Sequence, residues 1–526
     1  MKNLYPNYEK SLVNFSATIL KEFGISSEYS TLSRIDKLLK EEEYKNIVVL
    51  LYDGLGSKII EKHLDKNSFL VKNKVCDITS TVPSTTMAAT TSILSGKTPY
   101  EHGWIGWNMY FKDLDKTITI ARNKVKNSNE ELDFKVTQSF LKYESIFDKI
   151  NNSLENKAYG LFPFGVGAYE NRKEAYERIV NLSQNSGKKL IYAYFEEPDS
   201  VMHITGVTSS ESHEEILKID NEVRELCDRL RDSIIFVIAD HGHVDCEFLV
   251  LKEYEDIYSL VERTFDIEAR CVGIKVKEGK QEAFKNKFLE KFGDYFLLMD
   301  YEEAISKKIF GIGVEHERFR DTIGDFVAIA TNKYALNYDD FDPVFKSGHA
   351  GLTEKEMLVP IVAIKKKPFK DGVRSVVKGD YKEIKELCNM MQKSRVGKRK
   401  DLFCDFNSLS PVEFDNYCGR STPYMCFVYT IEDKIVGFIK LRLKNLSGHR
   451  LFTNFVYIEL ENIYVKDGYR GQGVGTELMN YALNYAKKNR VNKLEYRAWA
   501  FEEETNKFIE KFGAKKLFTV LEMDLR

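Results

Sequence analysis

The sequence predicts an α/β protein made of two units, and three observations support this fold class. First, its 526 residues exceed the roughly 250–300 residues at which a single core stops growing. Second, short apolar runs alternate with helical patterns in the N-terminal part, which is typical of a sheet covered by helices. Third, the charged stretch "KKKPFKDG" (365–372) contains Pro and Gly and is typical of a linker. We therefore expect a mostly parallel sheet with helices on both faces in residues 1–365, and a smaller α/β domain in residues 373–526.

Four apolar runs of the first unit predict strands that are buried on both faces. The runs are "NIVVLLY" (46–52), "KLIYAYF" (189–195), "IIFVIA" (234–239) and "MLVPIVAI" (357–364). Three of them are followed at once by an acidic residue: Asp53, Glu196 or Asp240. Ligands of such sheets bind beyond the carboxyl ends of the strands, so we expect a site there. The segment 251–340 has no metal-type cluster, and we expect an insertion that caps this site.

Composition excludes several classes of partner. The chain has 78 Lys and Arg against 80 Asp and Glu, a net charge of −2, so no overall field attracts a nucleic acid polymer or an anionic membrane. No apolar run reaches the roughly 18 residues of a membrane span, and the start of the sequence is patterned like an amphipathic helix rather than a signal peptide. The 8 Cys form no C-x-x-C pair. We expect a cytoplasmic location and reduced thiols, and a homodimer is compatible with the sequence.

The strongest chemical signal is a set of Asp and His residues in compact motifs. "EEPDSVMH" places Asp199 and His203 four residues apart, which puts both side chains on one face of a helical turn. "YDGLG", "IADHGH" and "SGHAG" supply the others at strand ends or between glycines. One strand-end Asp is usually a helix cap and one His is usually a buried polar residue. Together, and in this order, they indicate a metal site. The candidate ligands are Asp53, Asp199, His203, Asp240, His241 and His349.

Over roughly the first 365 residues these motifs resemble the alkaline phosphatase superfamily, and within it the nucleotide pyrophosphatase/phosphodiesterase branch. The resemblance implies two neighbouring metal ions. One would be held by Asp53, Asp240 and His241. The other would be held by Asp199, His203 and His349. Asp and His ligands without thiolates suit zinc, with manganese as the alternative.

The stretch "TVPSTTMAATTSILSGKTPYEHGW" (81–104) matches the pattern around the nucleophile of that family. The resemblance assigns Thr86 as the nucleophile and as a metal contact, with Thr85 as the second candidate. A Thr hydroxyl is inert at neutral pH, and a bound dication lowers its pKa. A helix that begins near Met87 would direct its amides at the phosphoryl group. Asn108 in "HGWIGWN" is the candidate donor to a phosphoryl oxygen.

A second motif lies near the C-terminus, where "YRGQGVG" follows an apolar run and precedes an amphipathic helical pattern. Glycines at such a turn let backbone amides converge on a pyrophosphate. The region from about 373 to 526 resembles the GNAT acetyltransferase superfamily, whose R-x-x-G-x-G loop binds acetyl-CoA. Glu459 and Glu461 are candidate bases, of which we assign Glu461. Tyr496 or water would replace the acid that this family carries in its last helix. The assigned acetyl-CoA residues are Val465, Arg470, Gly471, Gln472, Gly473, Val474, Gly475 and Thr476.

These motifs predict a bifunctional enzyme. The first unit would be a two-metal phosphodiesterase or nucleotide pyrophosphatase that acts on a phosphodiester or nucleotide-like substrate. The second would be an acetyl-CoA-dependent N-acetyltransferase of a small amine. Three alternatives remain: a phosphonoacetate-type C–P hydrolase, a phosphomonoesterase, and a hydrolase that is gated by acetyl-CoA binding.

Overall fold

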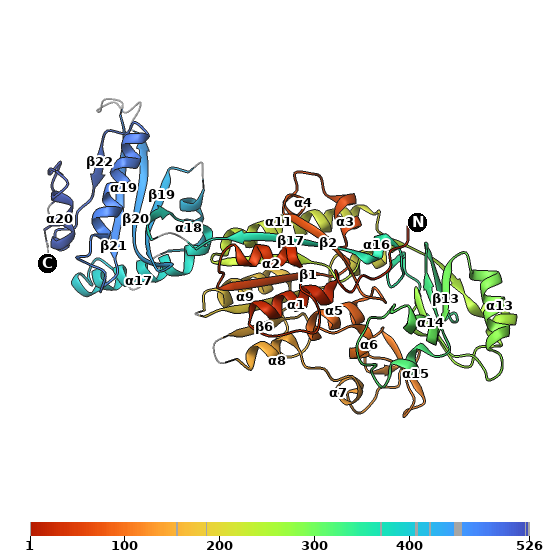
Figure 1. The fold of residues 1–526 in the computed structure, drawn as a ribbon. Coiled ribbons are helices and arrows are strands. Elements are labelled where there is room, and N and C mark those ends of the chain that lie inside the picture. The colour runs from red at the N-terminus through yellow and green to blue at the C-terminus, as the bar shows by residue number, and fades with distance from the viewer. Residues whose placement is uncertain are drawn as a thin grey trace. The chain divides into compact units, whose positions relative to one another are not determined.

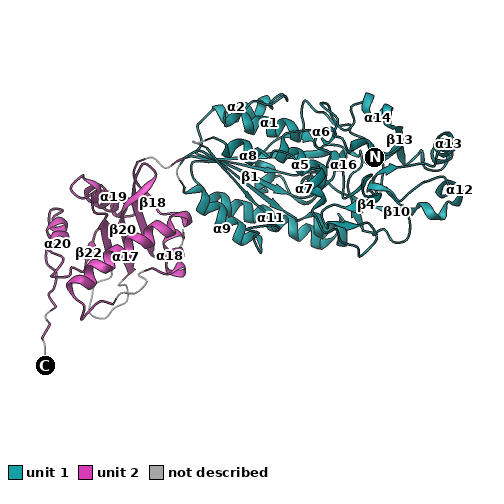
Figure 2. Cartoon of the chain, turned by 90° about the horizontal axis from the view of Figure 1, so that it is seen from below, with its two compact units in different colours: residues 1–367 teal, residues 368–526 magenta. Residues whose placement is uncertain are grey.

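The computed structural model describes the chain except residues 1, 154–155, 186, 369–370, 405–408, 420–421, 446–454, 521 and 524–526. The chain folds into two compact units, residues 1–367 and residues 368–526 (Figure 2). Each unit has its own sheets and its own hydrophobic cores.

The central sheet of the first unit has the strand order β2-β17-β8-β1-β7-β6 within the described residues. Strand β1 pairs in parallel with β7 and β8, and β6 pairs in parallel with β7. Strand β17 runs antiparallel to both of its neighbours. The four predicted apolar runs form β1, β7, β8 and β17. The strands are β1 (Asn46–Tyr52), β2 (Lys74–Thr79), β6 (Lys157–Leu161), β7 (Lys189–Phe195), β8 (Ser233–Ile238) and β17 (Leu358–Lys366).

Helices cover both faces of this sheet because each has one apolar stripe. In the first helix, Leu12, Phe15 and Ile19 are spaced by three and four residues and are all buried. Figure 2 shows α1, α2 and α8 on one face and α9 and α11 on the other. The helices around the sheet are α1 (Leu12–Glu22), α2 (Ser33–Lys40), α3 (Ser57–His63), α4 (Phe69–Lys72), α5 (Thr86–Ser95), α8 (Ile146–Asn151), α9 (Arg172–Ser183), α10 (Asp199–Thr205), α11 (Ser210–Arg229) and α16 (Glu354–Met357).

A second, antiparallel sheet of this unit has the order β13-β14-β12-β11-β3-β4-β5. It combines strands from the predicted insertion with a hairpin from residues 108–125, which the sequence did not link to it. The link is the pairing of Ile267 with Asn108. The strands are β3 (Asn108–Phe111), β4 (Lys116–Thr119), β5 (Lys124–Val125), β11 (Asp266–Glu268), β12 (Cys271–Ile274), β13 (Phe296–Asp300) and β14 (Phe326–Ala330).

Further strands and helices complete the first unit (Figure 1). Two pairs of strands stand apart from the large sheets, β9 with β16 and β10 with β15. These strands are β9 (Val244–Asp245), β10 (Glu247–Val250), β15 (Tyr334–Asn337) and β16 (Ser347–Gly348). The helices are α6 (Pro99–His102), α7 (Val136–Phe140), α12 (Glu255–Tyr258), α13 (Gln281–Phe292), α14 (Tyr301–Ser306) and α15 (Phe319–Ile323).

The second unit is built on a sheet with the order β18-β19-β20-β21-β22. Its strands are antiparallel except for the parallel pair of β21 and β22. The register between β20 and β21 shifts near Lys440, so that Glu461 lies at a β-bulge. The strands are β18 (Gly372–Ser375), β19 (Tyr424–Ile431), β20 (Lys434–Asn445), β21 (Val456–Val465) and β22 (Leu494–Tyr496). The helices are α17 (Tyr381–Lys398), α18 (Pro411–Cys418), α19 (Val474–Lys488) and α20 (Glu503–Glu510).

Within the described residues, no helix combines the length and the apolar character that crossing a bilayer requires.

Candidate active site

Two of the predicted carboxylates meet because their strands are parallel neighbours. Asp53 follows β1 directly and Asp240 follows β8. The amide of Gly54 donates to Oδ1 of Asp240 at 3.1 Å, which places the two strand ends in one loop cluster. Burial, the charge of Asp240 and the charge of Asp199 raise the pKa of Asp53 well above its ordinary value. Buried carboxylates this close together need a compensating cation if they are to be ionised together.

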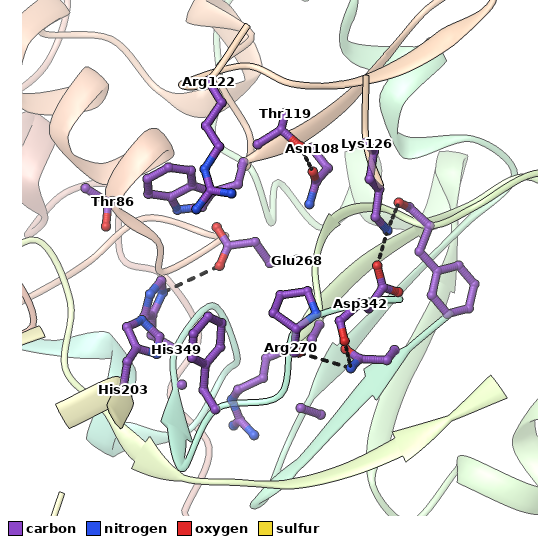
Figure 3. A pocket seen from close by; sticks show the side chains of 18 of the residues that line it. Thr86, Asn108, Thr119, Arg122, Lys126, His203, Glu268, Arg270, Asp342 and His349 are labelled. Carbon is purple, nitrogen blue, oxygen red and sulfur yellow. Dashed lines mark hydrogen bonds and ion pairs between the residues drawn. The ribbon is translucent and has the colours of Figure 1, made fainter. Parts of the chain in front are cut away.

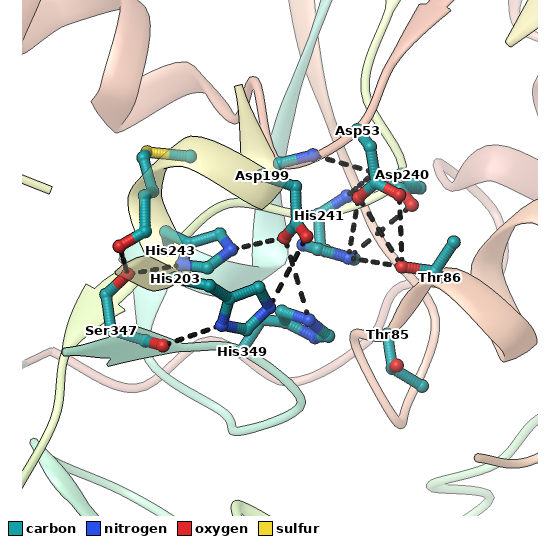
Figure 4. Close-up of polar contacts among 12 residues, drawn as sticks. Asp53, Thr85, Thr86, Asp199, His203, Asp240, His241, His243, Ser347 and His349 are labelled. Carbon is teal, nitrogen blue, oxygen red and sulfur yellow. Dashed lines mark hydrogen bonds and ion pairs between the residues drawn. The ribbon is translucent and has the colours of Figure 1, made fainter. Parts of the chain in front are cut away.

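Thr86 occupies the first turn of α5 and faces this pair (Figure 4). Its Oγ1 donates to Oδ2 of Asp53 at 3.2 Å and lies 3.3 Å from Nε2 of His241. Thr85 is the extended residue that precedes the helix, and its side chain points away from the cluster in Figure 4. The turn of the chain into the helix therefore separates the two hydroxyls, and Thr86 is the one that lies among the metal-type residues.

A second group of metal-type residues assembles around Asp199. Nε2 of His203 lies 3.3 Å from Oδ2 of Asp199, one turn away on α10. Nε2 of His349 lies 3.7 Å from Oδ1 of the same carboxylate. Two groups of residues could each hold a metal ion, and within each group the donor atoms all lie within 4.8 Å of one another. One group is Asp199, His203, His243 and His349, and the other is Asp53, Asp199 and His241.

His243 belongs to this cluster and was missed by the sequence analysis. Its ring is fully buried, its Nε2 contacts Oδ1 of Asp199, and its Nδ1 lies 3.0 Å from Oγ of Ser347. The signal was the second His of "DHGH", two residues after His241. Gly242 lets the loop fold tightly enough to bring both rings inward, because a Cβ there would lie 2.0 Å from the carbonyl oxygen of Lys355.

The residues present fit a pair of divalent cations. Oδ2 of Asp240 and Nδ1 of His349 are buried atoms without a hydrogen-bond partner among the described residues. Buried polar atoms without partners are rare and require an explanation. The donors are carboxylate oxygens and imidazole nitrogens, a set that suits zinc or manganese.

The loop predicted to bind acetyl-CoA connects β21 to α19 in the second unit. Gly471 and Gly473 have φ angles of 77° and 90°, which favour glycine. Val465 ends β21, residues 470–473 form the turn, and residues 474–476 begin α19. Nε of Arg470 donates to the carbonyl of Val465 at 3.0 Å, so this side chain braces the loop.

Glu461 and Glu459 have different surroundings on β21. Oε2 of Glu461 accepts a hydrogen bond of 2.7 Å from the hydroxyl of Tyr417. Glu459 lies 3.2 Å from both Lys444 and Arg497, so its charge is already paired. Of the two carboxylates, Glu459 is the one that forms these ion pairs.

Comparison with known protein families identifies both parts of the chain. Residues 47–353 match the family described as type I phosphodiesterase / nucleotide pyrophosphatase. The chain belongs to this family. Residues 392–514 match the acetyltransferase (GNAT) family, so the phosphodiesterase-family unit is followed by a GNAT domain. No curated protein sequence matches the chain.

Solved structures also match this chain. One is murine ectonucleotide pyrophosphatase / phosphodiesterase 5, solved as an inactive variant in complex with AMP. It is 16% identical to this chain, and the match covers 62% of this chain and 88% of the murine chain with a TM-score of 0.50. The likeness shows a shared fold. The human counterpart is 14% identical, with coverages of 61% and 88% and a TM-score of 0.46. A mutant of the BH1408 protein from Bacillus halodurans is 20% identical, covers 29% of this chain and 99% of that chain, and has a TM-score of 0.28.

In this phosphodiesterase-family unit the second sheet also contributes to the site. Glu268 at the end of β11 accepts a hydrogen bond from Oγ1 of Thr85, and its Oε2 lies 3.7 Å from Nδ1 of His349. Burial raises the pKa of Glu268 to about 8, against the opposing effect of the Thr85 hydrogen bond. Sequence reasoning missed Glu268, because the surrounding "FDIEARC" (265–271) contains no His and no Asp-His motif like those of the other candidate ligands.

The cluster opens into a pocket of about 850 Å³. Its walls come from both sheets of the phosphodiesterase-family unit (Figure 3). Asn108, the predicted phosphoryl donor, lies in this wall. Its Oδ1 accepts a hydrogen bond of 2.7 Å from Thr119, and its Nδ2 lies 3.5 Å from the carbonyl of Ile267. Thr119 thus orients the amide, and the weakly held Nδ2 remains the donor that could face a ligand.

Proposed function

We propose that the first unit hydrolyses phosphodiesters or pyrophosphates of nucleotide-like compounds, with Thr86 as nucleophile and two zinc ions as cofactors. The observation that carries the proposal is the position of Thr86 Oγ1, 3.2 Å from Asp53 and 3.3 Å from His241. Its location in the first turn of α5 adds the amides of a helix start, which attract phosphoryl oxygens.

The chain would hold the two cations with different residues. Asp53, Asp240 and His241 would hold one. Asp199, His203 and His349 would hold the other, with His243 against Asp199. When bound, such ions lower the pKa of a coordinated hydroxyl and offset the charge of phosphoryl oxygens. Manganese is the alternative metal.

The residues of the chain then have separate tasks in the reaction. The backbone of α5 holds Thr86 so that Oγ1 faces the reacting phosphorus. Oγ1 forms a bond to phosphorus as the ester oxygen of the leaving group departs, and water later cleaves the phosphothreonine. Asn108, on the pocket wall, would donate from Nδ2 to a phosphoryl oxygen.

The test compares bis(4-nitrophenyl) phosphate with 4-nitrophenyl phosphate, using zinc-loaded protein, chelator-treated protein and the Thr86→Ala variant. The proposal expects turnover of the diester that requires both zinc and Thr86. If the diester is not cleaved while phosphonoacetate is, the C–P hydrolase alternative replaces the phosphodiesterase. Preferred cleavage of the monoester would favour the phosphomonoesterase alternative.

For the second unit we propose that the loop of residues 470–475 binds acetyl-CoA and that a small amine is acetylated with Glu461 as base. The β-bulge supports this role because it turns Glu461 out of the regular pairing of β21. Acetyl-CoA binding by calorimetry and CoA release with a panel of amines test the two steps separately. Binding without CoA release on any amine, together with an effect of acetyl-CoA on diester hydrolysis, would instead support the gated hydrolase.

A further inference from the structure

Four cationic side chains line the pocket of the first unit: Arg122, Lys124, Lys126 and Arg270. Three of these four come from one segment, the end of the β4–β5 hairpin. These cations line the same pocket as the acidic, metal-type cluster. A cation that the protein already neutralises contributes little to ligand binding, so the partners of each of the four decide which could bind a ligand.

The two lysines are neutralised by the protein. Nζ of Lys124 lies 2.7 Å from Oε1 of Glu131. Nζ of Lys126 lies 3.0 Å from Oδ1 of Asp342, and both side chains of this pair are largely buried. Lys126 also donates to the carbonyl of Phe265 at 3.0 Å. These contacts hold the hairpin in place and leave neither ammonium unpaired.

Arg270 is neutralised more completely. Its guanidinium is buried and forms two hydrogen bonds with Glu356, of 2.6 and 2.8 Å. It also donates to two carbonyl oxygens, those of Asn332 and Tyr334. Arg270 therefore has a structural task beneath the loop that carries His349.

Arg122 differs from the other three. Among the described residues, no carboxylate forms an ion pair with its guanidinium and no acceptor receives a hydrogen bond from it. The side chain is exposed, whereas Thr86 is only 8% exposed and His241 is fully buried. Figure 3 shows it extending from the hairpin into the pocket, with Thr86 on one side and Asn108 and Thr119 on the other. Arg122 therefore lies nearer the solvent than the reacting centre.

We propose that Arg122 binds a second oxyanion of the substrate, a carboxylate or a phosphoryl group on the part of the molecule that is not the reacting phosphoester. The proposal rests on the proposed phosphodiesterase function and narrows its substrate class. A planar guanidinium with free donors matches both kinds of oxyanion in a bidentate arrangement. An unpaired cation inside a pocket also favours an anionic ligand over a neutral one.

The test uses three diesters that share a 4-nitrophenyl ester and differ in the other arm, which is phenyl, 4-carboxyphenyl or 4-phosphonophenyl. Chromatography of the products records which ester bond is cleaved. For wild-type protein with zinc, the proposal expects kcat/KM to be about tenfold higher for at least one charged compound than for the phenyl compound. A carboxylate and a phosphoryl partner are distinguished by which charged arm is preferred.

Variants of Arg122 and of the nearby Lys124 show which side chain causes the preference for a charged diester. Arg122→Gln should reduce the ratio of charged to uncharged kcat/KM to within about twofold, and Arg122→Lys should keep part of it, since one charged hydrogen bond accounts for about a tenfold effect. Lys124→Gln is the matched control and should keep the ratio, because that ammonium is already paired with Glu131. If Arg122→Gln slows all three diesters equally, Arg122 contacts the reacting phosphoryl group and the proposal is wrong.

A binding measurement separates this proposal from the proposed function. The same compounds are titrated by calorimetry into zinc-loaded Thr86→Ala protein with and without Arg122→Gln. Tighter binding of a charged compound that disappears with Arg122→Gln supports the oxyanion site even if the wild-type protein cleaves none of the diesters. The same ratio of affinities in both proteins would overturn the proposal, whatever the outcome of the activity assay.

Discussion

Nδ1 of His349 lies 3.7 Å from Oε2 of Glu268, and none of the described residues makes a hydrogen bond to that nitrogen. His349 comes from the loop after β16, and Glu268 comes from β11 of the second sheet. Glu268 also accepts from Thr85, the residue before the proposed nucleophile. The second sheet thus reaches both a candidate metal ligand and the start of α5.

The first prediction concerns Glu268 and pH. Its pKa is raised from 4.5 to about 8 in the folded protein, so the folded state binds the proton more tightly than the unfolded state. Its contribution to stability is therefore full below pH 4.5 and is lost as pH rises toward 8. Between these two pH values, Glu268 should lower the free energy of unfolding of the metal-free protein by up to about 1.4 kcal/mol for each pH unit.

Glu268→Gln removes the titrating proton and should flatten that dependence. Urea unfolding of chelator-treated protein at several pH values measures it, and the transition that moves when zinc is added belongs to the first unit. Equal slopes for wild type and variant would show that Glu268 does not titrate in this range.

The second prediction separates the two adjacent threonines. Valine keeps the shape of threonine and removes the hydroxyl. Thr86→Val should lower kcat for a diester by at least about 10³-fold, because Oγ1 is the attacking atom. Thr85→Val removes only the hydrogen bond to Glu268 and should cost less than about tenfold. Single-turnover kinetics of both zinc-loaded variants measure the difference, and the reverse order would make Thr85 the nucleophile.

The third prediction concerns His243, which contacts Asp199. His243→Ala should weaken zinc binding by about 10–100-fold, as loss of a neighbouring partner of a metal ligand typically does. Competition with a chelator dye measures the affinity. His63→Ala is the matched control, since His63 is also buried but its Nε2 donates to the carbonyl of Val207, outside the cluster. Equal affinities in the two variants would remove His243 from the metal site.

The fourth prediction concerns Gly242, between His241 and His243. Gly242→Ala places a Cβ 2.0 Å from the carbonyl oxygen of Lys355, so the loop must move. We expect a loss of about 2–4 kcal/mol in the free energy of unfolding and weaker zinc binding. Gly165→Ala serves as comparison, because its φ of 80° is unfavourable for alanine but no atom of the described residues lies within 4 Å of the added Cβ. It should cost about 1–2 kcal/mol and leave zinc binding intact.

The fifth prediction tests the loop of the GNAT domain. Gly473→Ala introduces a side chain at a φ of 90° and should change the loop that presents its amides to a pyrophosphate. We expect the dissociation constant of acetyl-CoA to rise by at least about tenfold. For Gly397→Ala in α17, no atom in the described part of the chain lies within 4 Å of the added Cβ, so this change should leave binding unchanged. Calorimetry on the full chain compares the two variants.

Patterns among residues that are close in the sequence were sufficient to predict the buried strands of the central sheet. Runs such as residues 47–52 and 234–239 are apolar because both faces of their strands are covered. The four-residue spacing of Asp199 and His203 predicted a shared helical face, and both residues lie on α10. A mostly parallel sheet and a site at its strand ends followed from the same patterns.

Contacts between distant segments were not predictable in this way. The hairpin at residues 108–125 joins the sheet of residues 266–330 through a single pairing at Ile267, and no local period encodes that register. Glu268 and His349 are likewise far apart in the chain, and only the packing of their segments brings them to 3.7 Å. His243 is recognisable in the sequence as the second His after Asp240. Whether its side chain points into the cluster depends on how tightly the loop at Gly242 is packed.

The sequence by itself determined the α/β class, because periodicity and strand ends depend on neighbours along the chain. It also predicted a division after residue 365, the candidate Asp and His ligands from short motifs, and Thr86 from the family resemblance. Only the tertiary structure decided that Glu268 and His243 lie at that site. It also decided that, among the described residues, Arg122 has no ion-pair partner whereas Lys124 and Lys126 each have one. Burial and charge pairing depend on which distant segments pack together, and that is a property of the folded chain as a whole.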